Sequence, residues 1–218
     1  MHIIGVLNTK GGCGKTTITT CLAVRASKDG LVAVCDLDPQ GSYGDWYSRR
    51  GAPDNPALLT GAELASDAVE SLNMASAYDY VLFDGPPGAL MVTEDAVRAS
   101  HLVVIPMRAS GLDINASRDC IQLCEDEGVP FLVVINGSNS RSDQKLVEQT
   151  QNLLFNWRVP IAKSVIKHRV AYINAYTTGK TGPEKDAAAA TEIDELWREI
   201  RAAVRKAAKG VKTSESGL

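Results

Sequence analysis

The sequence has no cysteine pair in a C-x-x-C arrangement, and its five cysteines are odd in number and lie mostly within apolar runs. This argues against a disulfide framework and suits reduced thiols in a cytoplasm. A basic leader with a cleavable apolar segment and an apolar run of membrane-spanning length are both missing from the sequence. Basic residues are not in excess, because 23 Lys and Arg stand against 26 Asp and Glu. We therefore expect a soluble cytoplasmic protein that is not basic overall, although a local basic patch remains compatible with this composition.

Apolar residues are plentiful, at 44% of 218 positions, which is enough for one sizeable core. No internal repeat or long low-complexity linker divides the chain. We expect a single domain over residues 1–209 and a disordered tail over 210–218.

Five short apolar runs are bounded by Gly, Pro, Asp or Asn, at residues 2–7, 31–36, 78–84, 101–106 and 131–136. They are continuous and rich in β-branched residues, which is typical of strands covered on both faces of a parallel sheet. Segments of helical period lie between them, for example residues 16–27, 113–125 and 143–155. The pattern predicts an α/β fold with a doubly wound, mostly parallel sheet flanked by helices.

The first strand-to-helix turn reads NTKGGCGKTT, residues 8–17. The strict phosphate-loop spacing G-x-x-x-x-G-K-[ST] would need glycine where this chain has Thr9, so the loop is atypical. Lys15 still matches the lysine that neutralises the β- and γ-phosphates, and Thr16 matches the hydroxyl ligand of Mg²⁺. Backbone N–H groups of the loop would surround the polyphosphate, at Gly11, Gly12, Cys13 and Gly14. The turn predicts nucleotide binding with ATP and Mg²⁺ as cofactors.

Aspartates end two of the apolar runs, where a parallel sheet presents its ligand-binding edge. Asp36 and Asp38 follow the second run, and Asp84 ends the third. Such residues also occur as plain caps of turns and helices. Together with the phosphate loop they favour a catalytic Mg²⁺ site.

The motifs KGGCGKTT, DLDPQG and FDGPPG resemble the deviant Walker A, Walker A′ and Walker B motifs of the ParA/MinD family of P-loop ATPases. The resemblance extends from Met1 to about Trp197 and is closest to the short ParA proteins of plasmid partition. It implies that Lys10 reaches the ATP of a partner subunit in a sandwich homodimer. It also implies that Asp38 orients the attacking water, that Asp84 acts on Mg²⁺ through water, and that Thr17 contacts the α-phosphate.

Other positions carry weaker expectations. Asp36 is expected to be a supporting carboxylate. Pro106, Arg108 and Asn136 follow strands and are positional candidates for the adenine contacts. Only the backbone amide of Cys13 would be used, so we expect no redox role for its thiol.

Two basic segments in the C-terminal third are candidate DNA contacts. Lys167, His168 and Arg169 fall in a stretch that resembles a ParA segment for binding DNA without sequence preference. Basic residues also recur at intervals of four on a later amphipathic helix, at Arg201, Arg205 and Lys209. A charge row of this kind is more often a solvated face.

The resemblance implies a slow ATPase that a ParB-like centromere-binding partner stimulates, acting in plasmid or chromosome partition at the nucleoid. A ParA-like ATPase that positions a non-DNA cargo, such as a protein microcompartment, shares every motif and is the alternative. A MinD-like membrane ATPase is disfavoured because the C-terminal helix is rich in Ala and Val and poor in bulky apolar residues. An iron–sulfur ATPase is disfavoured because Cys120 and Cys124 lie four apart on a helix that packs in the core.

Overall fold

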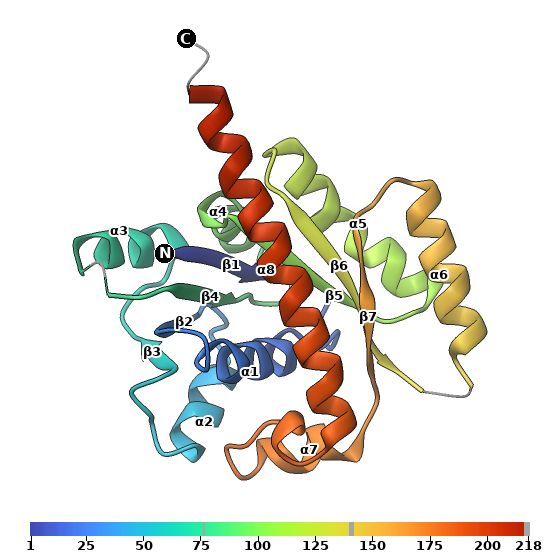
Figure 1. Ribbon diagram of the computed structural model, residues 1–218, viewed down its shortest axis with the longest axis horizontal. Coiled ribbons are helices and arrows are strands. Elements are labelled where there is room, and N and C mark those ends of the chain that lie inside the picture. The colour runs from blue at the N-terminus through green and yellow to red at the C-terminus, as the bar shows by residue number, and fades with distance from the viewer. Residues whose placement is uncertain (76, 140–141, 216–218) are drawn as a thin grey trace.

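The computed structural model describes residues 1–75, 77–139 and 142–215, with side chains omitted for 73–75 and 208–215 (Figure 1). Within these residues the chain forms seven strands, eight α-helices and one short 3₁₀ helix. The strands are β1 (His2–Val6), β2 (Val32–Asp36), β3 (Ala57–Leu59), β4 (Tyr80–Asp84), β5 (Leu102–Met107), β6 (Phe131–Ser138) and β7 (Ile161–Lys167). The helices are α1 (Lys15–Ala26), α2 (Ser42–Arg49), α3 (Ala65–Ala75), α4 (Leu90–Ala99), α5 (Gly111–Asp126), α6 (Gln144–Asn156), α7 (Val170–Tyr176), η1 (Gly182–Glu184) and α8 (Ala187–Glu215).

All seven strands pair in parallel in one sheet of order β3-β2-β4-β1-β5-β6-β7. The chain first moves outward from the central β1 to β2 and β3, and then returns through β4 before crossing to β5. The carboxyl ends of β1, β2 and β4 are consequently neighbours, with Asp84 in register with both Val6 and Asp36. Ligands bind beyond such strand ends in doubly wound sheets, so this edge positions the site.

The sheet is covered on both faces, which explains the continuous apolar runs. Ile4 and Val6 of β1 face a core layer built with α1, α2 and α8, whereas Ile3 and Leu7 face a layer built with α3 to α6. Figure 1 shows α1 and α8 together on the near side of the sheet. Trp197 of α8 is fully buried in the first layer and packs edge-on against Tyr80 of β4.

The helix α8 also covers the outer edge of the sheet at β7. The carboxylate of Glu199 accepts hydrogen bonds from the backbone N–H groups of Lys163 (2.8 Å) and Ser164 (2.9 Å). Two turns earlier on α8, Glu192 accepts the N–H of Lys167 at 3.2 Å. Side chains of one helix thus satisfy backbone donors that no neighbouring strand reaches.

The predicted fold class is confirmed, and all five apolar runs form strands. Two strands were missed. β7 is half-exposed and alternates buried with exposed positions, and β3 has only three half-buried residues, so neither appears as a continuous apolar run. The segment with Lys167 and Arg169 therefore includes the end of β7.

The last helix extends past the expected domain boundary. α8 continues to Glu215, across most of the expected tail at 210–218, and residues 216–218 lie outside the described residues. The boundary at residue 209 and the tail stay predictions. Among the described residues, no helix combines the length and the apolar composition that crossing a membrane requires.

Candidate nucleotide-binding site

The loop between β1 and α1 is held open by local backbone geometry. Gly12 and Gly14 have φ angles of 71° and 96°, in the left-handed region that favours glycine. Gly14 is the N-cap of α1, so the loop amides and the helix N-terminus point to the same place. An added Cβ on Gly14 would come within 2.1 Å of Asn136 Nδ2. Only glycine fits there without displacing the Asn136 side chain.

Asn8, which we did not single out from the sequence, fixes the start of the loop. Its amide donates to the Pro106 carbonyl and to the Ser117 hydroxyl, both at 2.8 Å, and its Oδ1 accepts the N–H of Lys10 at 2.9 Å. The side chain is 1% exposed. A buried asparagine after a strand is an insufficient signal by itself, because its partners lie about a hundred residues away in sequence.

The two lysines of the loop differ in their surroundings. Lys15 is buried, and its ammonium donates to the Lys10 carbonyl at 3.1 Å, within the loop. The side chain of Lys10 is exposed, although its backbone is tied into the loop at both the N–H and the carbonyl. Lys15 is thus placed to meet phosphates bound in its own loop, while Lys10 projects from it.

Cys13 is buried and its thiol donates to the Lys10 carbonyl at 3.2 Å. Burial raises the pKa of this thiol, and the nearby Lys15 offsets the rise only in part. A protonated, inaccessible thiol is a poor nucleophile, which agrees with a purely structural position in the loop.

Asp84 lies at the end of β4 and is fully buried. Its Oδ1 accepts the Thr19 hydroxyl at 2.8 Å, while its Oδ2 has no hydrogen-bond partner among the described residues. Burial raises the pKa of Asp84 to about 7, against the lowering effect of the Thr16 and Thr19 hydroxyls. An unpaired buried carboxylate oxygen is costly, so this atom is poised to accept a further donor or to act on a cation.

Asp36 ends β2 beside Asp84, and Asp38 follows two residues later. The Asp36 carboxylate accepts the backbone N–H groups of Asp38, Tyr43 and Gly44 at 3.0–3.2 Å, so it organises the loop that carries Asp38. Burial raises the pKa of Asp36 even though these three donors favour its charged form. The Asp38 side chain is half-exposed and accepts only the Gln40 N–H, at 3.0 Å, among the described residues. No group of three or more His, Cys, Asp or Glu side chains in the described residues could hold a metal ion alone.

A cavity of about 640 Å³ opens beside the loop. Gly12, Gly14 and Thr17 form one wall, and further polar residues line the rest, namely Arg108, Ser110, Asp113, Asn136, Ser138, Asn139, Asp143, Lys167, His168 and Arg169. Asn136 donates to the Cys13 carbonyl at 2.8 Å, and Arg108 donates to the Gly12 carbonyl at 3.1 Å. The volume and the convergent polar groups are those of a small-molecule site.

Pro106 does not line this cavity, and its assignment to the adenine contacts stays a prediction. β5 continues to Met107, so Pro106 lies within the strand, in register with Val134 and buried. Its carbonyl is taken by Asn8. The apolar run appeared to end at the proline because proline interrupts the β-branched residues.

The first basic group predicted to touch DNA is turned toward the nucleotide cavity. Lys167, His168 and Arg169 all line it. Arg169 is also held by Glu192 at 2.5 Å and by Asp186 at 3.5 Å. Its guanidinium is therefore largely committed within the molecule.

The second basic group lies at the other end of the sheet, near His2 and Tyr80. Arg201 pairs with Asp29 at 2.7 Å, whereas Arg205 is exposed. Arg198 and Lys206 are also exposed on α8. Lys209 is within the helix, but its side chain lies outside the described residues.

Comparisons with known proteins agree with this site. The family described as the CobQ/CobB/MinD/ParA nucleotide binding domain matches residues 4–182. The "Maintenance of carboxysome distribution protein A" of Halothiobacillus neapolitanus is 30% identical over 210 residues, covering 90% of this chain and 95% of that protein. "Protein ParA" of Rhizobium radiobacter is 28% identical over 134 residues, which are 58% of each chain.

Among solved structures, the MinD cell division protein of Aquifex aeolicus superimposes with a TM-score of 0.75 at 18% identity, covering 93% of this chain and 98% of that one. At this identity the likeness supports the fold alone. The match to the family model and the relative aligned over 90% of this chain establish the family. The chain belongs to the CobQ/CobB/MinD/ParA nucleotide-binding family, and within it to the ParA/MinD type of ATPases.

Proposed function

We propose that this protein is an ATP-driven positioning ATPase whose cargo is a protein body such as a carboxysome. ATP binding would pair two copies on DNA without sequence preference, and a partner protein on the cargo would speed an otherwise slow hydrolysis. The relative whose name refers to carboxysome distribution matches 90% of this chain, whereas the ParA relative matches 58%. We base the choice of cargo on this difference in coverage. It favours positioning over the plasmid partition that the motifs alone suggested.

Binding of the triphosphate would rest on the loop and the first turn of α1. The amides of the loop from Gly11 to Gly14 would face the phosphates, and the buried Lys15 ammonium would exchange its bond to the Lys10 carbonyl for phosphate oxygens. An ammonium paired with an anionic phosphate oxygen is bound more strongly than one that donates to a neutral carbonyl. Thr17, which lines the cavity, would contact the α-phosphate.

Mg²⁺ fits the residues at the end of β4. Thr16 would supply its hydroxyl, and the unpaired Oδ2 of Asp84 would hold a water ligand of the ion. The ion, when bound, neutralises charge that develops on the phosphates during hydrolysis. The Asp38 carboxylate accepts only one hydrogen bond among the described residues, at Oδ1, so its second oxygen would be available to orient the attacking water.

Pairing of two copies would use Lys10. Its exposed ammonium would reach the nucleotide of the partner subunit, so ATP would form part of the interface and ADP would hold it less well.

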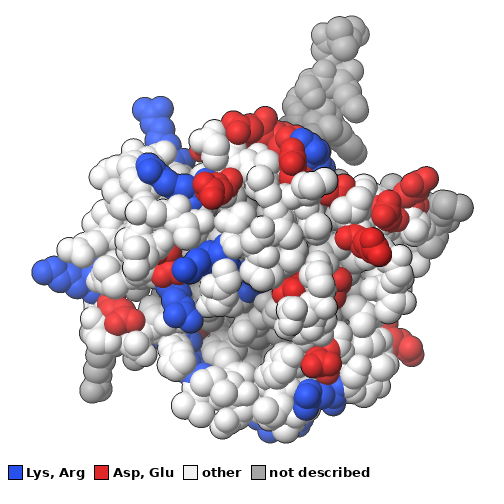
Figure 2. Space-filling view, turned by 180° about the vertical axis from the view of Figure 1, so that it is seen from behind, with Lys and Arg blue, Asp and Glu red and all other residues white. Residues whose placement is uncertain are grey.

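DNA binding would use the exposed cations of α8, chiefly Arg205 with Arg198 and Lys206. α8 lies on the near side in Figure 1. On the opposite side, acidic and basic side chains of the described residues are interspersed, and neither sign forms a continuous field (Figure 2). The acidic balance of the whole chain, with 23 basic and 26 acidic residues, requires that any DNA contact be local in this way.

Deletion of the gene in its own host tests the cargo. Protein microcompartments labelled through a shell protein should collapse into clusters or migrate to one pole, while a resident low-copy plasmid should be retained at the wild-type frequency. Plasmid loss with normally spaced compartments would instead favour partition with a ParB-like partner. Lys15→Ala expressed from its own locus should reproduce the deletion, because it removes nucleotide binding without removing the protein.

A further inference from the structure

The short helix α2 connects the loop of Asp38 to a distant part of the chain. At its N-terminus, the Asp36 carboxylate accepts the N–H groups of Tyr43 (3.0 Å) and Gly44 (3.1 Å), and the same carboxylate accepts the N–H of Asp38 at 3.2 Å. The Asp38 carbonyl in turn accepts the N–H of Gly41 at 2.8 Å. A shift of α2 would therefore move Asp38, because backbone N–H groups of both donate to the Asp36 carboxylate.

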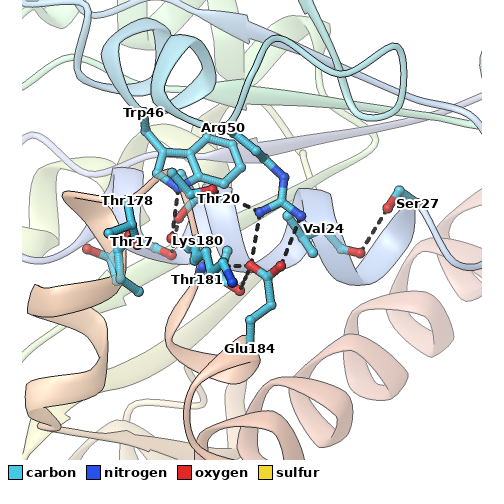
Figure 3. Close-up of polar contacts among 12 residues, drawn as sticks. Thr17, Thr20, Val24, Ser27, Trp46, Arg50, Thr178, Lys180, Thr181 and Glu184 are labelled. Atoms are coloured by element: carbon cyan, nitrogen blue, oxygen red, sulfur yellow. Dashed lines mark hydrogen bonds and ion pairs between the residues drawn. The ribbon is translucent and has the colours of Figure 1, made fainter.

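The C-terminal end of α2 is held by residues 176–184, which we call the clasp. Figure 3 shows Trp46 and Arg50 of this region directed at the clasp. The Trp46 indole donates to the Lys180 carbonyl at 2.9 Å. Arg50 donates to the Gly179 carbonyl at 2.9 Å and to both oxygens of Glu184, at 2.9 and 3.1 Å. The fork of the guanidinium fixes orientation as well as distance.

The backbones of the clasp and of the C-terminal end of α2 are closely packed. Gly179 has a φ of 64°, and a Cβ placed there would lie 2.2 Å from the Arg50 backbone nitrogen. The two backbones thus touch directly. Tyr176, at the start of the clasp, donates its hydroxyl to the Ser42 carbonyl at the opposite end of α2, at 2.8 Å.

The clasp is also fixed to the wall of the nucleotide cavity. It follows α7, whose Tyr172 and Ile173 line that cavity. A Cβ on Gly182 would lie 2.4 Å from the Tyr172 ring, so clasp and α7 are in close contact. Glu184 accepts the N–H and the hydroxyl of Thr181 at 2.7 and 2.9 Å, in addition to its bonds with Arg50. One carboxylate therefore joins α2 to the clasp and folds the clasp itself.

We propose that the clasp positions Asp38 for hydrolysis, with Arg50 and Trp46 acting through α2 as positioning residues. The proposal rests on the proposed ATPase function. The Arg50 and Glu184 side chains are 20% and 32% exposed, so solvent screens part of the attraction within the pair. Misplacement of a catalytic group by about 1 Å, in contrast, can lower a rate by about a hundredfold. The pair should matter more for turnover than for folding.

Arg50→Gln and Glu184→Gln test this, since each removes the forked ion pair and leaves the nucleotide site untouched. Single-turnover hydrolysis should fall by about tenfold or more, while the Kd for a fluorescent ATP analogue stays within about twofold of wild type. Arg50→Lys keeps the charge without the fork and should recover part of the rate. The matched control is Arg98→Gln, which removes a forked pair with Glu127 (2.9 and 3.0 Å) between α4 and α5. It should hydrolyse ATP at the wild-type rate.

Gly179→Ala provides an independent perturbation, because the added methyl group must push the Arg50 backbone away. It should show the same loss of turnover with retained ATP affinity. Wild-type turnover in folded Arg50→Gln and Glu184→Gln would overturn the proposal, and so would an equal loss of ATP affinity and rate. Absence of hydrolysis in the wild type, with DNA and cargo extract present, would overturn the proposed function and this inference with it.

Discussion

The exposed lysine of the loop offers the sharpest test of pairing through nucleotide. In Lys10→Ala the backbone contacts of residue 10, to the Asn8 side chain at 2.9 Å and to Lys15 Nζ at 3.1 Å, are all retained. The loop should keep its shape, and ATP should bind a single copy with nearly normal affinity. Only the exposed ammonium is lost.

The size of the expected effect follows from two-fold symmetry. Each hydrogen bond to a charged group contributes about 1.5–3 kcal/mol, and a symmetric dimer loses two of them. The total of about 3–6 kcal/mol corresponds to a dimer Kd weakened by about two to four orders of magnitude. A wild-type protein that pairs with a Kd of about 1 μM would then need about 0.1–10 mM protein to pair as Lys10→Ala.

Sedimentation velocity over a concentration series, with Mg²⁺ and a slowly hydrolysed ATP analogue, measures this directly. The matched control is Lys28→Ala, an exposed lysine just beyond α1. It should shift to dimer as the wild type does. Superimposable curves for Lys10→Ala and wild type would refute a role in the partner's site. Loss of analogue binding by the Lys10→Ala monomer would instead place the lysine in its own site.

Three further predictions use the same preparations. Asp38→Ala should bind ATP and pair but lose turnover, whereas Lys15→Ala should lose nucleotide binding itself; wild-type steady-state turnover in the former would contradict its assigned role. Arg205→Ala should weaken retention of any duplex DNA, with the largest effect at low salt. Arg201→Ala should weaken DNA retention less than Arg205→Ala, because Arg201 is paired with Asp29; a larger loss of DNA retention for Arg201→Ala in a filter assay would be inconsistent with binding through the exposed face of α8. Asp29→Ala should destabilise the fold by about 2–3 kcal/mol, because it leaves the buried Trp197 indole unsatisfied and breaks two screened ion pairs, a loss visible in the thermal midpoint.

The stabilisation by Asp29 should also depend on pH in a defined direction. Burial, the largest single influence, would raise its pKa, but the hydrogen bonds from Trp197 and Arg25 outweigh burial and lower it. A lowered native pKa means that the contribution is complete above the unfolded value near pH 4 and disappears as the pH falls through the native pKa. The difference in unfolding free energy between wild type and Asp29→Ala should therefore shrink only in acid. A difference that shrinks between pH 6 and 8 would point to another group.

Local, contiguous patterns were the part of this protein that the sequence could predict. The conformation of the loop from Asn8 to Thr17 depends on glycines within the loop itself. The five buried strands are visible in the sequence as unbroken apolar runs. Contacts over long sequence separations could not be predicted. Arg201 looked like a free cation in sequence, yet its partner Asp29 is 172 residues away.

The same reason explains the other differences. Arg169 is paired to Glu192 of α8 and to Asp186 just before that helix, which only the fold brings near it. β7 alternates because it forms the sheet edge, so a search for continuous apolar runs passes over it. Thr181 and Glu184 of the clasp match the local pattern of a capping box. The contact of the clasp with Arg50 has no such signature, since it joins residues 129 positions apart.

The carboxylates that α8 presents to β7 restrict how copies of this protein can associate. A free strand edge is a template for another chain, and pairing through it tends to propagate. Here Glu199 and Glu192 occupy three backbone donors of β7, and the opposite edge strand, β3, has only three residues. Both edges of the sheet are therefore poor templates for pairing with another copy. Association is left to side chains and bound nucleotide, and contacts of that kind can be released when the nucleotide changes.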